Sequence, residues 1–462
     1  MPTAIQKPTS ATLIGDDVPP LLPVTGHDLT APLVDGTLVR YANLDYAASA
    51  PALRAVADHV AAVLPYYASV HRGAGYASQV STALYESARQ EIGAFVGARS
   101  DDVVVVTRNT TDALSLLANA VRARVDDAEV LVLDLEHHAN LLPWTAGPHR
   151  LLPTQRTIAD TVAAVEAALT ERPAALVAVT GCSNVTGELL PIRTITALAH
   201  AHGARVVVDA AQLAPHRRID LARLGADYLA LSGHKLYAPF GAGALIGRRD
   251  WLDDAPPHLP GGGAVRQVSA DGVATWAPAP QRHEGGTPNV IGAAALAAAC
   301  RTLSSLPDGA LERHEAALAT RLIAGLARVP GARVLRIWED STNRVGVVGF
   351  TIDGHDPGRL AACLSAEHGI GVRDGRFCAH PLLDRLGVPG GALRASFGAG
   401  SGSADVDRLV EALHEVVANG ERWTYALSAG RWTPSPDPRP APQWASWQAA
   451  PDTGASPCTP SS

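Results

Sequence analysis

The stretch RVVVDAAQLAPHRRIDLARLGADYLALSGHK, residues 205–235, contains two apolar runs, the first ending at Asp209 and the second at Ser232. Similar runs precede it: VVVVT (103–107), VLVLDL (130–135) and ALVAVTG (175–181). Ala/Leu-rich helical patterns separate the runs. Continuous apolar strands that alternate with helices predict an α/β fold with a mainly parallel sheet covered on both faces. Ligands in such folds bind beyond the carboxyl ends of the strands, so the polar residues there are the site candidates.

The composition is that of a globular protein, because 47% of the 462 residues are apolar and 18% are charged. The net charge is -7 and no Lys/Arg block is present, so nucleic acid is not an expected partner. The apolar runs have the length of strands, and residues 1–30 lack a signal-peptide pattern. We therefore expect no membrane insertion and a cytoplasmic location.

The length predicts two domains with terminal extensions. A partly flexible arm (1–35), which lacks a sustained period, leads into a large domain (36–300). A smaller C-terminal domain (301–420) should contain a helix near 311–328, the strand VGVVGFTI (345–352) and a last helix near 404–418, with an N-terminal segment packed on it. Residues 421–462 are rich in Pro, Ser and Trp, a composition that predicts a flexible tail without helix or strand ladder. The alternative is that its tryptophans, Trp423, Trp432, Trp444 and Trp447, lie on the body or a partner.

Lysine is rare in this chain. Among 38 lysine and arginine residues only Lys7 and Lys235 are lysine. Arginine stays protonated in proteins, whereas a desolvated lysine amine can lose its proton and attack a carbonyl group. Lys235 is therefore a candidate for Schiff-base chemistry, with the chance survival of one lysine as the alternative.

Polar residues at three strand ends agree with this chemistry. Asp209, at the end of VVVD, could keep a pyridine nitrogen protonated, although an Asp after a strand is common. Ser232 and His234 flank Lys235 and suit a phosphate anchor. The TRNTTDAL segment (107–114) presents threonine hydroxyls and free backbone N–H groups where a strand turns into a helix, although an ordinary threonine N-cap explains it equally well.

Six motifs in a fixed order extend this pattern: TTD (110–112), EHHANLLPW (136–144), SNVTG (183–187), VDAAQ (208–212), SGHKLYAP (232–239) and EGGTPN (284–289). Over residues 40–418 the chain resembles the class V aminotransferase group of fold-type I pyridoxal-phosphate (PLP) enzymes. More narrowly, it resembles the group II cysteine desulfurases, which include selenocysteine lyases. The resemblance implies a large domain with a mainly parallel, seven-stranded type of sheet, a smaller α+β domain, and PLP as the cofactor.

The resemblance also implies roles for individual residues. Lys235 would bind the cofactor as an aldimine, Asp209 would pair with the pyridine nitrogen, Gln212 would contact the ring oxygen, and His137, rather than His138, would stack on the ring as a catalytic residue. The implied phosphate contacts are Thr110, Thr111, Ser232, His234 and Thr287, the last from the second subunit of a homodimer. The implied substrate contacts are His71 of SVHRG, Asn184, Arg373 and Arg394 of LRASFG.

Cys378 lies in GIGVRDGRFCAHPLL (369–383), which is similar to the loop in which the family's cysteine attacks sulfur. L-Cysteine would be converted to L-alanine, with a persulfide left on Cys378 for transfer to an acceptor protein or a small thiol. The attack needs a thiolate, which Arg373 and Arg376 could favour. The alternative for Cys378 is a buried apolar cysteine. Cys182, Cys300 and Cys363 lie in strand or helix patterns and are expected in the core. With Cys458 they make an odd set without CxxC spacing, so we expect neither a disulfide framework nor a metal site.

The loop departs from the family pattern at one point. Many group II enzymes have a His-His pair directly before the cysteine, where this chain has Arg376-Phe377. The change leaves open a C-S lyase, an aminotransferase or an epimerase that acts on another amino acid or on a cysteine conjugate. The sequence does not separate cysteine from selenocysteine, and it names neither the sulfur acceptor nor the pathway.

Overall fold

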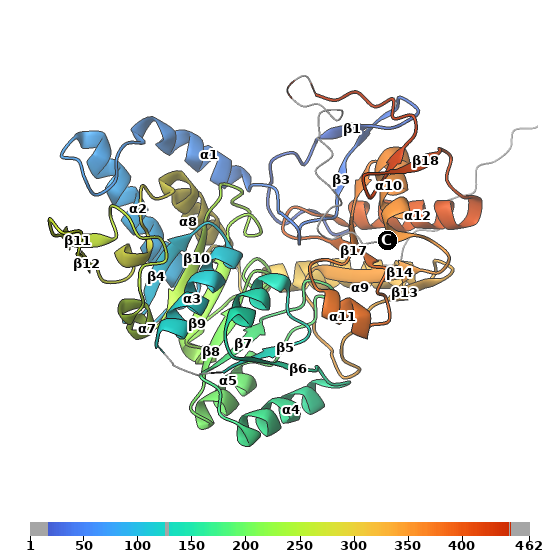
Figure 1. Ribbon diagram of the computed structural model, residues 1–462. Coiled ribbons are helices and arrows are strands. Elements are labelled where there is room, and N and C mark those ends of the chain that lie inside the picture. The colour runs from blue at the N-terminus through green and yellow to red at the C-terminus, as the bar shows by residue number, and fades with distance from the viewer. Residues whose placement is uncertain (1–16, 125–128, 443, 445–462) are drawn as a thin grey trace, which may run out of the picture.

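The computed structural model describes residues 17–124, 129–442 and 444, and its centre is a seven-stranded sheet (Figure 1). The strand order is β4-β10-β9-β8-β7-β5-β6. The strands are β4 (Val103–Thr107), β5 (Val130–Leu133), β6 (His149–Leu152), β7 (Leu176–Thr180), β8 (Arg205–Asp209), β9 (Tyr228–Ser232) and β10 (Gly243–Gly247). Only β10 is reversed, since it pairs antiparallel with both β4 and β9. The mainly parallel sheet that the sequence predicts is confirmed.

All five apolar runs form strands, and two further strands, β6 and β10, were not predicted. β6 is an edge strand whose sequence HRLL alternates between exposed and half-buried positions, so it has no continuous apolar run. β10 is fully buried between β9 and β4, but its sequence GALIG begins and ends with glycine, which weakens a strand pattern.

Helices cover both faces of the sheet, as alternating side chains require. On one face Val105, Val132 and Val207 pack with α3 (Thr110–Arg124) and α7 (Arg249–Asp254). On the other face Val104, Leu131 and Val206 pack against the remaining large-domain helices. These are α4 (Ile158–Glu171), α5 (Ile192–Ala201), α6 (Leu221–Leu224) and α8 (Val290–Ser304), with α1 (Arg54–Val63) and α2 (Tyr76–Phe95) packed on α8. Short 3-10 helices are η1 (Leu64–Tyr66), η2 (His138–Asn140), η3 (Leu142–Ala146) and η4 (Gln281–His283), and β11 (Val265–Val268) pairs with β12 (Ala274–Trp276).

The second core surrounds an antiparallel sheet in the order β13-β14-β17-β16. Its strands are β13 (Ala332–Val334), β14 (Val347–Ile352), β16 (Arg373–Gly375) and β17 (Ala392–Ser396), and its helices are α9 (Ala310–Leu326), α10 (Pro357–His368) and α12 (Ser403–Asn419). The short helix α11 (His380–Arg385) instead buries Leu382 and Leu383 in the core of the large sheet. The predicted helices near 311–328 and 404–418 and the strand at 345–352 correspond to α9, α12 and β14. In the described residues no helix combines the length and apolar character that crossing a membrane requires.

An N-terminal segment belongs to this second core. Val34, Ala42 and Leu44 are buried with residues of β14 and α10. β3 (Ala42–Asn43) pairs in parallel with β15 (Ile370–Gly371), and β1 (Thr30–Pro32) pairs with β2 (Leu38–Arg40). Of the arm predicted over residues 1–35, residues 1–16 lie outside the described residues, and the remainder includes β1 and the buried Val34. The domain boundaries at 300 and 420 stay predictions.

The prediction that residues 421–462 form no strand ladder was wrong for the first part of this tail. β18 (Tyr425–Ser428) and β19 (Arg431–Pro434) form an antiparallel hairpin that packs on α10 (Figure 1). Trp423 and Trp432 pack against the second core, as the alternative interpretation allowed, whereas Trp444 is 88% exposed. Burial of these two rings outweighs the weak local strand signal. Residues 443 and 445–462, with Trp447 and Cys458, lie outside the described residues.

Candidate active site

A cavity of about 320 Å³ opens at the carboxyl ends of the parallel strands, between the two cores. Every predicted site residue except His71 and Thr287 lines it. Those residues are Thr110, Thr111, His137, Asn184, Asp209, Gln212, Ser232, His234, Lys235, Arg373, Cys378 and Arg394. The lining also includes Asn109, Thr180 and Phe377, which sequence reasoning did not select. The strand-end rule would have identified Thr180, at the end of β7, and Asn109, two residues after β4.

Lys235 follows β9 and faces the cavity. Burial lowers the pKa of its amine, and the nearby guanidinium of Arg394 acts in the same direction against the carboxyl of Asp209. The environment therefore favours a neutral amine, which is the nucleophilic form.

Asp209 and Gln212 form the floor beside Lys235. Asp209 is 3% exposed, its Oδ1 accepts a hydrogen bond from the Ala211 N–H at 2.8 Å, and burial raises its pKa. A positively charged group, such as a protonated pyridine nitrogen, would restore its ionised form. The Gln212 amide donates to the Ala47 carbonyl at 2.7 Å, while its buried Oε1 has no hydrogen-bond partner among the described residues. Asp209 and Gln212 thus offer the groups expected to contact the PLP ring.

A hydroxyl cluster lies where α3 begins. The Thr110 N–H and hydroxyl both lie 2.7 Å from the Ser232 hydroxyl. Asn109, not a threonine, caps the helix, because its Oδ1 accepts the Asp112 N–H at 3.0 Å. Neither threonine side chain is therefore used as the helix cap, and a helix N-terminus with clustered hydroxyls suits a phosphate group.

His137 presents a neutral ring to the cavity. Burial, and then the charge of Lys235, lowers the pKa of this imidazole to about 3. Its Nδ1 accepts the Ala139 N–H at 3.0 Å, so Nε2 carries the proton. His138 is not a lining residue; its ring packs edge-on against His380 at 4.5 Å between centroids. Of the two histidines, His137 is thus the one that lines the cavity.

The loop of Cys378 has an unusual backbone. Phe377 and Cys378 have φ angles of 51° and 52°, in the left-handed region that non-glycine residues rarely adopt. The Phe377 carbonyl accepts the Asn184 side-chain amide at 2.9 Å, and the Cys378 carbonyl accepts the His138 N–H at 2.8 Å. Hydrogen bonds from the large domain therefore hold the thiol of Cys378 at the cavity.

Two arginines of neighbouring strands, Arg373 of β16 and Arg394 of β17, line the same cavity and are directly paired in register. Arg394 is 3% exposed; it donates to the Asn184 carbonyl at 2.9 Å and to Asp45 at 3.1 Å. Its buried Nε–H has no partner among the described residues, and burial lowers the pKa of the guanidinium. A substrate carboxylate would supply the acceptor that Nε–H lacks and a second negative charge beside Asp45.

Arg376 does not line the cavity. Its guanidinium pairs with Asp384 and also donates to the His380 carbonyl. Arg373 is thus better placed than Arg376 to act on the Cys378 thiol. Cys182, Cys300 and Cys363 are buried, as the sequence predicts.

His71 and Thr287 lie outside the cavity, on the exposed surface. His71 Nε2 lies 2.8 Å from Glu86, and its ring packs edge-on against Tyr85. Tyr85 also donates to Glu284 at 2.9 Å, and Glu284 opens the EGGTPN loop that carries Thr287. One network therefore anchors both segments, away from the cavity of the same chain.

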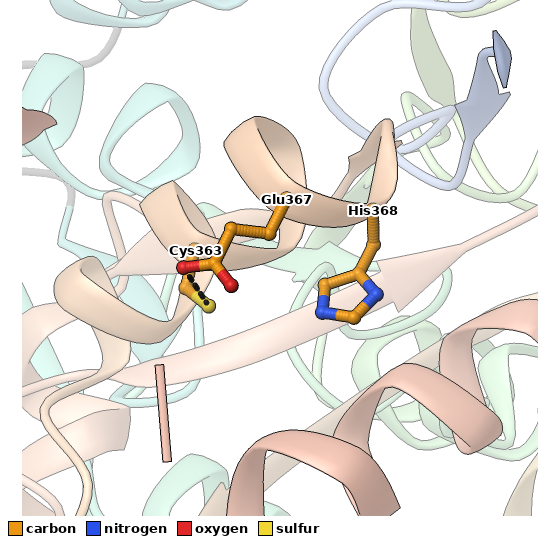
Figure 2. A group of neighbouring side chains, drawn as sticks. All are labelled: Cys363, Glu367 and His368. Atoms are coloured by element: carbon orange, nitrogen blue, oxygen red, sulfur yellow. Dashed lines mark hydrogen bonds between the residues drawn. The ribbon is translucent and has the colours of Figure 1, made fainter. Parts of the chain in front are cut away.

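Cys363, Glu367 and His368 of α10 form a cluster with the residue types of a metal site (Figure 2). The Glu367 oxygens are already occupied, since they accept the backbone N–H groups of Arg422 and Trp423 at 2.9 and 3.1 Å and the hydroxyl of Tyr425 at 2.8 Å. Burial raises the pKa of the Cys363 thiol, which opposes the thiolate that a metal requires. We assign the cluster to the attachment of the C-terminal hairpin.

Comparison with known proteins agrees with this geometry. Residues 42–409 match the aminotransferase class V family, and the chain belongs to that family of PLP-dependent enzymes. It is 38% identical to the cysteine desulfurase of Dickeya dadantii over 392 residues, which cover 83% of this chain and 93% of the relative. It is 36% identical to a probable cysteine desulfurase of Streptomyces coelicolor, over 81% of this chain and 91% of the relative. The crystal structure of the cysteine desulfurase CsdA from Escherichia coli superposes with a TM-score of 0.73 at 35% identity, covering 82% of this chain and 95% of that one.

Proposed function

We propose that this protein is a PLP-dependent cysteine desulfurase, which converts L-cysteine to L-alanine and leaves the sulfur as a persulfide on Cys378. The observation that carries the proposal is that Lys235 and Cys378, 143 positions apart in the sequence, line one cavity with the buried clamp residue Arg394. The names of the relatives support the same reaction.

The bound cofactor would act as an electron sink, which makes the Cα proton of the substrate acidic and its Cβ–S bond labile. Thr110, Thr111, Ser232 and His234 would hold its phosphate, and Asp209, Gln212 and His137 would hold its ring. The neutral amine of Lys235 would take the Cα proton, because its lowered pKa leaves it able to accept one. Arg394, with Asn184 beside it, would orient the substrate through its carboxylate.

Cys378 would complete the reaction. Its thiolate sulfur forms a bond to the substrate sulfur while the Cβ–S bond breaks, and the electron pair left at Cβ takes up a proton. L-Cysteine and the Cys378 thiol thus become L-alanine and a Cys378 persulfide, without an external oxidant. An acceptor protein or a small thiol would then remove the outer sulfur. A cytoplasmic location stays a prediction from the sequence.

We further propose a homodimer in which Thr287 reaches the phosphate site of the second subunit, and His71 its substrate site. Both residues lie away from their own cavity. The surface nearby also exposes large apolar side chains: Leu64, Tyr66, Tyr67, Tyr76 and Leu259, which are 45–74% exposed. Such a concentration suits a subunit interface. Mixing Lys235→Ala subunits with Thr287→Ala subunits should restore cofactor binding at half of the hybrid sites, whereas no recovery would contradict the arrangement.

The central experiment measures alanine release from L-cysteine and L-selenocysteine, with mass spectrometry of the protein for added sulfur. Wild type should release alanine from L-cysteine and carry one added sulfur on Cys378, and Cys378→Ala should lose both. Cys300→Ala, which removes a buried thiol of α8, is the matched control and should keep both. Pyruvate, a keto acid or racemised substrate, with no effect of Cys378→Ala, would instead favour the lyase, aminotransferase or epimerase reaction.

A further inference from the structure

Three mutual contacts among Phe377, Asn184 and Arg394 join the Cys378 loop to Arg394. Arg394 donates to the Asn184 carbonyl at 2.9 Å, and the Asn184 side chain donates to the Phe377 carbonyl at 2.9 Å. The Arg394 guanidinium in turn lies over the Phe377 ring, 5.2 Å from its centroid. All three residues are at most 6% exposed and line the cavity, so water competes little with these contacts.

Three neighbouring groups each constrain a different part of the Arg394 guanidinium. One terminal nitrogen is bound to Asn184 and the other to Asp45, while the central carbon lies over the aromatic ring of Phe377. The Nε–H remains as the buried donor without a partner in the described part of the chain. A guanidinium fixed in this way has lost its conformational freedom before a carboxylate arrives, which favours binding.

The backbone at Phe377 indicates that these contacts have a function beyond filling space. Its φ of 51° is a conformation that a large side chain adopts only when its surroundings impose it. The same loop places the thiol of Cys378 one residue further on. A single aromatic side chain therefore links the group that would grip the substrate carboxylate to the group that would attack its sulfur.

We propose that Phe377 determines the selectivity of this site for α-amino acids, by holding Arg394 in the orientation that binds the α-carboxylate. The inference rests on the proposed function for the identity of the substrate. Phe377 acts through Arg394 and is a positioning residue. It favours small amino acids with a free carboxylate over amines that lack one.

The test compares L-alanine with ethylamine, which is alanine without its carboxylate, as ligands of the holoenzyme. Binding is followed by the change in cofactor absorbance, so no sulfur chemistry is needed. Phe377→Leu should weaken L-alanine binding about 30-fold, the size of a desolvated cation–π contact, while ethylamine affinity changes less than about twofold. With L-cysteine, KM should rise by a similar factor with a smaller effect on kcat. Equal weakening of both ligands, or of neither, would overturn the proposal.

Three further variants separate positioning from packing. Phe377→Tyr keeps the aromatic face and should retain wild-type L-alanine affinity; a loss as large as that of Phe377→Leu would overturn the proposal. Adding Phe377→Leu to Arg394→Gln should cause no further loss, because the clamp is already absent, and an additive loss would contradict the link. Trp432→Leu removes another arginine–aromatic contact of 5.2 Å, with Arg359, far from the cavity, and should leave L-alanine binding unchanged.

The proposal and the proposed function fail in different experiments. If wild type releases no alanine from L-cysteine, the desulfurase assignment is wrong. The ligand comparison still reports on Phe377 in that case, because it depends only on cofactor binding and on Arg394. If wild type desulfurates cysteine but Phe377→Leu keeps both L-alanine affinity and KM, the inference about Phe377 alone is wrong.

Discussion

Lys235 and Cys378 face one cavity but are held by different means. Lys235 follows a buried parallel strand, β9, and its predicted partners Asp209 and Ser232 end strands of the same sheet. Cys378 lies in a loop with left-handed backbone angles, and side-chain and backbone hydrogen bonds from the large domain hold it. The cofactor half of the site thus depends on regular structure, whereas the half that selects the reaction depends on a few specific contacts. The second half can therefore change without loss of the first.

The largest effect is expected at the lysine. Lys235→Ala should remove the absorbance of lysine-bound cofactor and reduce turnover by about 10²- to 10⁴-fold, the contribution of a positioned proton-transfer group. Lys235→Arg should fail in the same way, because arginine does not deprotonate. Lys7→Ala, at the only other lysine of the chain, is the control. Spectra and alanine release measure the result, and an unchanged spectrum in Lys235→Ala would contradict the assignment of the cofactor half.

Asp209→Asn tests a strand-end residue without changing its shape. The amide cannot stabilise a protonated pyridine nitrogen, so turnover should fall on the order of 10²-fold, similar to the removal of one electrostatic contact in other active sites. The cofactor should remain bound. Asp250→Asn, which affects a surface ion pair with Arg205, is the matched control and should behave like wild type. Near-normal turnover in Asp209→Asn would mean that another group holds the ring nitrogen.

Asn184→Ala tests the other half of the site. It removes the hydrogen bond to the Phe377 carbonyl but keeps the backbone carbonyl that binds Arg394. Loss of one buried hydrogen bond should slow persulfide formation about 3- to 10-fold, while the absorbance of bound cofactor stays unchanged. Asn343→Ala, at an exposed asparagine, is the control. A loss of cofactor in Asn184→Ala would show that the two halves are not independent.

The same difference explains what the sequence could predict. Asp209, Ser232 and Thr110 follow local apolar runs, and parallel strands bring such ends to one edge, so the cofactor half follows from short-range pattern. The contact between Asn184 and Phe377 joins residues 193 positions apart, and no local pattern encodes it. From the sequence, Phe377 could therefore be recognised only as a departure from the family pattern, and its place in the cavity could not be predicted.

The C-terminal hairpin failed prediction for a related reason. Local composition at residues 421–434 disfavours a strand pair, but Glu367 of α10 offers buried acceptors to this segment. Tertiary contacts thus override weak propensity. The family match ends at residue 409, so the hairpin lies beyond the matched residues.

The smallest effect on activity is expected from Glu367→Gln, which tests whether the Cys378 loop is held locally or by the small domain as a whole. The Glu367 side chain is 1% exposed, and replacing its charge should reduce stability by about 1–3 kcal/mol. If the contacts with Asn184 and His138 suffice to hold the loop, kcat and KM should stay within about twofold of wild type. Hydrogen exchange at residues 421–434 should increase, whereas exchange in the Cys378 loop should not.

The pH dependence of stability tests the same variant independently. Burial opposes ionisation of Glu367, but the hydrogen bonds from Arg422 and Tyr425 outweigh this effect, so the pKa of Glu367 is lowered. A carboxyl whose pKa is lowered in the folded state stabilises the fold at pH values above its unfolded-state pKa. This stabilisation is lost as the pH falls through the folded-state pKa. The difference in thermal unfolding between wild type and Glu367→Gln should therefore shrink below about pH 4. Glu339→Gln, at an exposed pair with Arg156, should show no such difference at any pH. If Glu367→Gln slowed persulfide formation as much as Asn184→Ala, the Cys378 loop would depend on the whole small domain. The claim that a few specific contacts hold this half of the site would then be wrong.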